Sequence, residues 1–142
     1  YLRNARLKDA DLSRACLDSA DFTDSLLLDV NLNSAHLCCA NLKEVNLCGA
    51  DLRNAILCDA DFSSAYLGGT LLNDANASHA VFKEAVLCSA NFNGVNLNGG
   101  KLSQADMRGA NLANIRHDWG TKYNDAKNLK KTRHCPAEWE CK

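Results

Sequence analysis

No run of 18 consecutive apolar residues occurs in this 142-residue sequence, so no membrane-spanning helix is predicted. No signal-peptide pattern is visible, and the chain begins within a sequence unit at Tyr1, as a processed or trimmed chain would. A large excess of charge is missing as well, because 16 basic side chains are balanced by 17 acidic ones. This balance argues against a nucleic-acid binder that relies on net charge.

The short motifs of common enzymes and metal sites are absent too. The sequence contains no glycine-rich phosphate loop, no H-E-x-x-H, no G-x-S-x-G and no C-x-x-C pair. Enzymes also need a concave pocket with convergent polar groups, and the repeat described next fills the interior with Leu, Phe and Ala. We therefore expect no catalytic residue, no bound metal, no cofactor and no small-molecule substrate.

A five-residue repeat makes up most of the chain. From Leu2 to Leu112 a large apolar residue is due at every fifth position, and 21 of these 23 positions hold Leu or Phe. The exceptions are Ala77 and Met107. Two residues before each of these positions stands a smaller residue, mostly Ala. The spacing matches neither the helical period of about 3.6 nor the strand period of 2.

A three-residue strand followed by a two-residue turn explains a period of five. The small and the large residue are two positions apart, so on an extended segment they point to the same side. The two remaining positions are rich in Gly, Asn, Asp and Ser, which favour turns. A chain that bends the same way every five residues winds into coils, which stack as parallel strands about 4.8 Å apart. The pattern predicts an all-β parallel solenoid.

The repeat unit resembles that of a known family. Residues 10–12, 40–42 and 50–52 read ADL, ANL and ADL, which match the A(D/N)LXX signature of the pentapeptide repeat proteins. The resemblance covers about four fifths of the chain. It implies a right-handed quadrilateral β-helix with one pentapeptide on each of four faces, so that four pentapeptides complete a coil and about five to six coils follow. Three Phe residues are multiples of 20 apart and would share one face: Phe22, Phe62 and Phe82.

The end of the repeat predicts a division of the chain into two parts. Residues 1–116 form the β-helix, and residues 117–142, in which the period of five fails, form a C-terminal helical cap. A short α-helix is expected from Asn124 or Asp125 to about His134, because Asn and Asp favour helix N-termini.

The cap is expected to cover the core of the last coil, because terminal repeats of solenoids need such protection. Tyr123, Ala126 and Leu129 recur at helical spacing, and Trp119 and Trp139 flank them. The alternative is that this tail is a docking element or a dimer contact.

The cysteines divide into two groups. Six of the eight lie in the repeat at outward positions. Cys38 and Cys58 are four pentapeptides apart, which is one coil, and should be neighbours on one face. Cys48 and Cys88 are two coils apart, which would separate them by roughly 10 Å, beyond the reach of a disulfide.

The other two cysteines, Cys135 and Cys141, follow the repeat in the segment CPAEWEC. A disulfide between them would close a short loop and favours an oxidising compartment. The alternative is a reducing cytosol with eight free thiols.

Two groups of polar side chains could form a metal site or a catalytic site, but regular surface positions on successive coils explain both groups better. His36, Cys38 and Cys58 would face outward together as a soft-metal patch, yet a flat strand surface does not readily surround a metal ion. The Asp and Asn residues before the large positions resemble paired catalytic carboxylates. Their recurrence every five or ten residues instead indicates outward rungs that bond to turns and neighbouring coils.

One outer face differs from the others in polarity. The face around Leu42 carries side chains of both charges, and the face around Leu32 carries many Asn residues. The face around Leu47 shows no charge between Asp29 and Asp106. We call its candidate partner-binding residues the apolar strip: Leu26, Leu28, Tyr66 and Val86. Exposed apolar strips often mark contacts, although β-forming residues can also simply stabilise a sheet.

The leading functional hypothesis is a non-enzymatic protein-binding or scaffold module with an unknown protein partner. The resemblance implies similarity to small thylakoid-lumenal and cyanobacterial members, so the thylakoid lumen or another oxidising compartment is favoured over the cytoplasm. We expect a monomer or an end-to-end dimer.

A second hypothesis is a DNA mimic that inhibits type II topoisomerase, as quinolone-resistance members of the family do. The net charge of −4 over residues 1–115 is small for such a mimic. A third is a metal- or redox-responsive surface formed by the outward cysteines.

Overall fold

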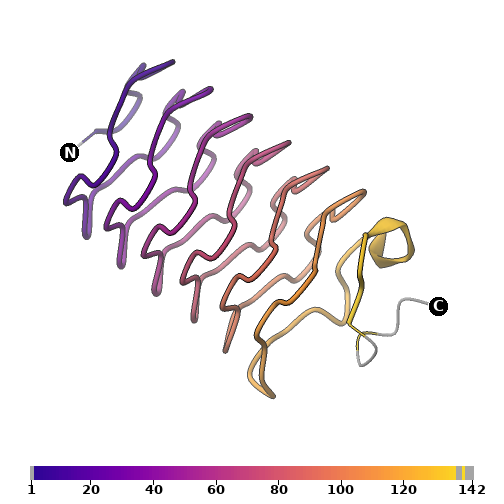
Figure 1. Cartoon of the computed structure of the whole chain (residues 1–142). Coiled ribbons are helices and arrows are strands. Elements are labelled where there is room, and N and C mark those ends of the chain that lie inside the picture. The colour runs from indigo at the N-terminus through magenta and orange to yellow at the C-terminus, as the bar shows by residue number, and fades with distance from the viewer. Residues whose placement is uncertain (1, 137–138, 140–142) are drawn as a thin grey trace.

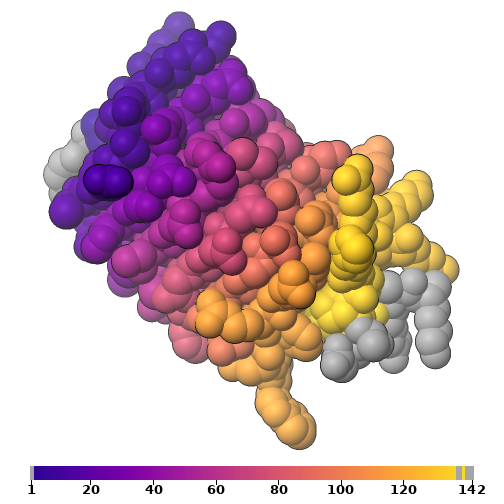
Figure 2. Space-filling model, viewed as in Figure 1, coloured from indigo at the N-terminus to yellow at the C-terminus, as the bar shows by residue number. Residues whose placement is uncertain are grey.

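The computed structural model describes residues 2–136 and residue 139. The chain winds into stacked coils that form a rod (Figures 1 and 2). Parallel bridges join residues 20 apart, from Arg6 with Leu26 to Asn96 with Arg116. Each coil contributes four bridging residues, one to each face, so the predicted coil of four pentapeptides is present.

The corners of the coils place residues in the left-handed backbone region. In a representative corner, the N–H of Ala55 donates to the carbonyl of Leu52 at 3.1 Å, and Asn54 has a φ of 58°. Positive φ values recur at every fifth residue from Asn4 to Asn114. Only five of these residues are glycine, so most corners hold a side chain in a conformation that costs about 1 kcal/mol or more.

The Asp or Asn before the large residue bonds to the turn that follows it. Oδ1 of Asp51 accepts a hydrogen bond from the backbone N–H of Arg53 at 3.0 Å, and Asn111 accepts one from Ala113 at 3.1 Å. These N–H groups have no partner in the bonds between coils, so the side chain satisfies them. This confirms that the Asp and Asn residues are outward rungs that bond to the turns.

The core is a continuous column of the small and large repeat residues. From Phe22 to Leu112 these side chains are almost completely buried. The rings of Phe62 and Phe82 stack with centroids 4.9 Å apart, as their separation by one coil predicts. Where a small position holds a hydroxyl, the group is paired inside the core, as when Thr70 Oγ1 donates to the carbonyl of Leu47 at 2.8 Å.

The first coil is less well covered than the others. Its inward side chains are only partly buried: Leu2, Leu7, Ala10, Leu12, Leu17 and Ala20. Within the described residues another coil contacts them from one side only.

The tail corrects the prediction of a C-terminal α-helix. Within the described residues its only helical element is η1, a 3-10 helix spanning Leu129–Lys131. The backbone N–H groups of Lys127 and Arg133 donate to the carbonyls of Ala105 and Ala110 on the preceding coil, at 2.8 Å and 2.7 Å. The segment therefore extends the β-stack, and the N–H of Arg133 is not available for the helical bond that an α-helix through His134 requires.

The tail nevertheless covers the end of the core, as predicted. Tyr123, Ala126 and Leu129 pack against the core, and Trp139 is buried. The rings of Tyr123 and Trp139 stack at 4.3 Å. Trp119 takes no part in this cover, because its side chain is 100% exposed.

Bridges in the tail join residues 21 or 22 apart in place of 20, from Lys101 with Lys122 to Asn111 with Arg133. Most of a further coil thus follows the predicted five to six. The boundary between residues 116 and 117 as a division between domains stays a prediction.

Candidate protein-binding surface

The apolar strip lies on one face of the rod in a continuous ladder. The bridges run from Leu26 to Asn46, from Asn46 to Tyr66 and from Tyr66 to Val86. Leu28 lies two residues after Leu26 on the same coil. The structure therefore brings together the four residues that the sequence selected, along three successive coil steps.

Two members of the apolar strip are strongly exposed. Leu26 is 40% exposed and Tyr66 is 51% exposed, and together with Trp119 they are the large exposed apolar side chains of the described chain. Leu28 and Val86 are half-buried. Gly68, which lies two residues after Tyr66, adds no side chain on that flank, and the sulfur of Cys48 lies beside it.

The backbone beneath the strip is held on both sides. The N–H of Tyr66 donates to the carbonyl of Val45 at 2.9 Å, and its carbonyl accepts the N–H of Leu47 at 2.8 Å. The backbone of Val86 is bonded in the same way to Ala65 and Leu67. The exposed side chains thus project from a rigid surface, and binding a partner would require little ordering of the backbone.

Charged residues close the strip at both ends. Arg6 precedes Leu26 in the ladder, and Asp106 follows Val86. Asp106 pairs with Arg108 at 2.9 Å. Burial raises the pKa of Asp106, but hydrogen bonds from Arg108 and Asn128 outweigh this effect and leave the pKa below its ordinary value. At the C-terminal end of the strip, the negative charge of Asp106 is therefore balanced by the positive charge of Arg108.

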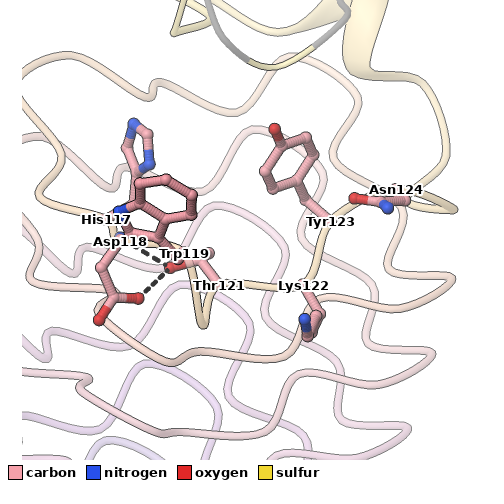
Figure 3. Close-up of a pocket in the computed structure, with 7 residues that line it drawn as sticks. All are labelled: His117, Asp118, Trp119, Thr121, Lys122, Tyr123 and Asn124. Atoms are coloured by element: carbon pink, nitrogen blue, oxygen red, sulfur yellow. Dashed lines mark hydrogen bonds between the residues drawn. The ribbon is translucent and has the colours of Figure 1, made fainter.

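A hollow of about 550 Å³ lies at the C-terminal end of the rod, lined by residues 117–119 and 121–124 (Figure 3). Its carboxylate is structural, because Oδ1 of Asp118 accepts the N–H groups of Gly99 at 2.7 Å and Gly120 at 3.0 Å. These bonds, above all the one from Gly99, lower the pKa of Asp118. The hydroxyl of Thr121 donates to the carbonyl of Leu97 at 2.9 Å. Asp118 and Thr121, which also bond to each other, thus brace a corner of the chain.

The braced corner exposes a side chain that the sequence interpretation assigned to the core cover. Trp119 stands between Asp118 and Gly120 and is fully exposed. The segment near residue 120 projects from the rod (Figure 2). The exposure of Trp119 could have been predicted from the failure of the five-residue period at residue 117. A loop that is longer than the repeat must bulge outward.

The thiols of the described repeat do not gather into a metal centre. Six cysteines are free, all in the repeat. Among the described residues, no three His, Cys, Asp or Glu side chains are grouped so that they could hold a metal ion. The patch of His36, Cys38 and Cys58 therefore lacks the arrangement that a metal-responsive surface requires. The predicted disulfide of Cys135 with Cys141 stays a prediction, because Cys141 lies outside the described residues.

No helix in the described part of the chain is long and apolar enough to cross a lipid bilayer.

The ladder, the corners and the filled core together define a parallel β-solenoid that displays side chains on flat faces. The family model of pentapeptide repeats matches residues 1–24, 25–63, 60–99 and 90–114. The chain belongs to the pentapeptide repeat family, whose members fold as right-handed quadrilateral β-helices and are generally non-enzymatic structural or binding modules.

Three solved structures illustrate the likeness. HetL from the cyanobacterium Nostoc sp. strain PCC 7120, a protein involved in the regulation of heterocyst differentiation, is 26% identical, with a TM-score of 0.50 over 92% of this chain and 78% of HetL. A protein of the Arabidopsis thaliana thylakoid lumen is 32% identical, with a TM-score of 0.58 over 75% of this chain and 71% of its own.

The third structure is QnrB1, a plasmid-mediated fluoroquinolone resistance protein. It is 14% identical, with a TM-score of 0.59 over 85% of this chain and 78% of QnrB1, and this likeness shows the fold alone. No curated protein sequence matches the chain.

Proposed function

We propose that this chain is a non-enzymatic protein-binding or scaffold module that contacts its protein partner through the apolar strip. One observation carries the proposal: Leu26 and Tyr66 are exposed on a rigid, uncharged ladder between Arg6 and Asp106. Tyr is among the residue types enriched at energetic hot spots of interfaces. The filled core supports the absence of catalysis, since it leaves no room for a substrate inside the rod.

We further propose an oxidising compartment, such as the thylakoid lumen, as the place of action. The 32% identical relative from the Arabidopsis thylakoid lumen supports this location, as does the predicted disulfide of Cys135 with Cys141. The predicted assembly state is a monomer or an end-to-end dimer.

The test is capture of the partner by the immobilised chain, followed by measurement of its dissociation constant. Tyr66→Glu places a charge in the middle of the strip and should weaken binding about tenfold or more, which corresponds to roughly 1.4 kcal/mol. The side chain is half exposed, so the melting temperature should stay nearly unchanged.

Two matched variants locate the contact. Glu84→Lys changes an exposed residue on the mixed-charge face and should have little effect on affinity. Trp119→Ser removes the projecting ring without uncovering the core, whereas deletion of the tail would remove Tyr123 and Trp139 as well. Loss of binding in Trp119→Ser, with Tyr66→Glu unaffected, would assign docking to the tail.

The DNA-mimic hypothesis predicts a different result in a different assay. Inhibition of supercoiling by a type II topoisomerase at low micromolar concentration, retained in Tyr66→Glu, would favour mimicry over the apolar strip.

A further inference from the structure

The face that carries Cys38 and Cys58 contains two thiols in register on adjacent coils. A bridge joins His36 to Ile56, and the N–H of Cys39 donates to the carbonyl of Cys58 at 2.8 Å, so the two strands are aligned around the cysteines. Parallel strands lie about 4.8 Å apart, which is within the range of Cα separations found for disulfides.

The thiols of this pair interact across the boundary between the two coils. The N–H of Cys38 donates to Oδ1 of Asp18 on the preceding coil at 2.7 Å, so a side chain at this position can reach the next coil. The Cys38 thiol interacts electrostatically with Cys58 on the next coil. Burial, and then the neighbouring Cys58, raise the pKa of the Cys38 thiol.

The next coil fixes the position of the second sulfur. Asn76 Nδ2 donates to the sulfur of Cys58 at 3.1 Å, and the hydroxyl of Ser78 lies 3.5 Å from it. Both cysteines are half-buried, so a small oxidant can still reach them.

We propose that Cys38 and Cys58 are an oxidation site that forms a reversible disulfide between adjacent coils. With a small disulfide such as oxidised glutathione, one protein thiolate attacks an oxidant sulfur, forms a mixed disulfide and releases one glutathione thiolate. The second protein thiol loses its proton and attacks the protein sulfur of the mixed disulfide, which releases the second glutathione. Two protein thiols are oxidised, one glutathione disulfide is reduced, and the two glutathione thiols take up the two protons.

The bond would join the second and third coils covalently. A covalent link between residues 20 apart restricts the unfolded chain more than the folded rod, in which the two coils are already neighbours. Oxidation would therefore stabilise the rod without changing the apolar strip on the other face.

The experiment treats the reduced, full chain with oxidised glutathione, blocks the remaining thiols with N-ethylmaleimide and maps the repeat cysteines by mass spectrometry. A Cys38–Cys58 disulfide is expected, together with a rise of roughly 5–10 °C in the melting temperature. Cys38→Ser and Cys58→Ser should abolish both effects. Cys39→Ser should preserve them, because this neighbour is an exposed corner residue.

The chain offers an internal control in the pair Cys48 and Cys88, which two coil steps separate. These thiols should remain alkylatable under the same treatment. Gly68→Cys, made in the Cys38→Ser/Cys58→Ser background, places a Cβ 3.5 Å from the Cys48 sulfur and should create a new disulfide with Cys48. If this control pair forms its bond while wild-type Cys38 and Cys58 stay free, or carry only glutathione, the proposal is wrong.

Discussion

The corner glycines allow the stacking of the coils to be tested one contact at a time. Gly69 and Gly94 both occupy the left-handed position of a corner, with φ values of 66° and 74°. A Cβ added to Gly69 would meet nothing within 4 Å. A Cβ added to Gly94 would collide with the carboxylate of Asp74, one coil away. The two Gly→Ala variants therefore share a backbone effect and differ in one steric contact.

The backbone effect is small because two contributions oppose each other. The left-handed conformation costs a residue with a Cβ about 1–2 kcal/mol, while the reduced freedom of the unfolded chain returns about 0.4–1 kcal/mol. Gly69→Ala should thus destabilise by about 0–1.5 kcal/mol. Gly94→Ala should cost about 1 kcal/mol more, since Asp74 must leave its rotamer or move aside.

Urea unfolding followed by circular dichroism measures these differences, and a double-mutant cycle isolates the contact. In the Asp74→Ala background the excess cost of Gly94→Ala should disappear. If Gly69→Ala is as damaging as Gly94→Ala, or if Asp74→Ala brings no relief, the corners of adjacent coils do not stack as described.

Two further predictions concern the core and the charged rungs. Leu57→Asp should prevent cooperative folding, because it buries an unpaired charge, whereas Arg53→Ala should change stability by less than about 1 kcal/mol; similar unfolding curves for both would refute the inward–outward register. Hydrogen bonds from Arg53 lower the pKa of the Asp51 carboxyl group in the folded protein. The ionised carboxylate therefore stabilises the fold at pH values above the pKa of Asp in the unfolded chain, which is about 3.9. This contribution to stability is lost as the pH falls through the lower pKa of the folded state. The midpoint of urea unfolding should therefore decrease below about pH 4, and less so in Asp51→Asn, whose amide oxygen still accepts the backbone N–H of Arg53; an equal decrease in both proteins would assign the acid sensitivity elsewhere.

The regular part of the fold could be predicted from the sequence because each repeat contains the residues that determine its own strand and turn. The Leu and Ala positions set which side faces inward, and an Asp or Asn such as Asp51 supplies the acceptor that each turn needs. The core column and the alignment of Phe62 with Phe82 followed directly from the spacing. The apolar strip was also predictable, since residues one coil apart must be neighbours once the coil length is known.

The tail was harder to predict because two structures compete for the same backbone groups. Tyr123, Ala126 and Leu129 fit a helical spacing, but the last regular coil offers carbonyls that Lys122, Lys127 and Arg133 can reach. In the structure, the backbone N–H groups of the tail bond to those carbonyls and do not form an α-helix. A signal was present in residues 121–123, where Thr, Lys and Tyr repeat the order of small, outward and large one residue out of phase.

The spacing of the rungs also limits the shape of a partner that can follow the apolar strip. Rungs repeat about every 4.8 Å along the rod, whereas a helix laid along it advances about 5.4 Å per turn. The two patterns drift apart by about 0.6 Å per coil and by about 2 Å over the three steps from Leu26 to Val86. An ordinary helix can thus match the whole uncharged stretch but little more, and a longer contact requires a partner with the pitch of a solenoid.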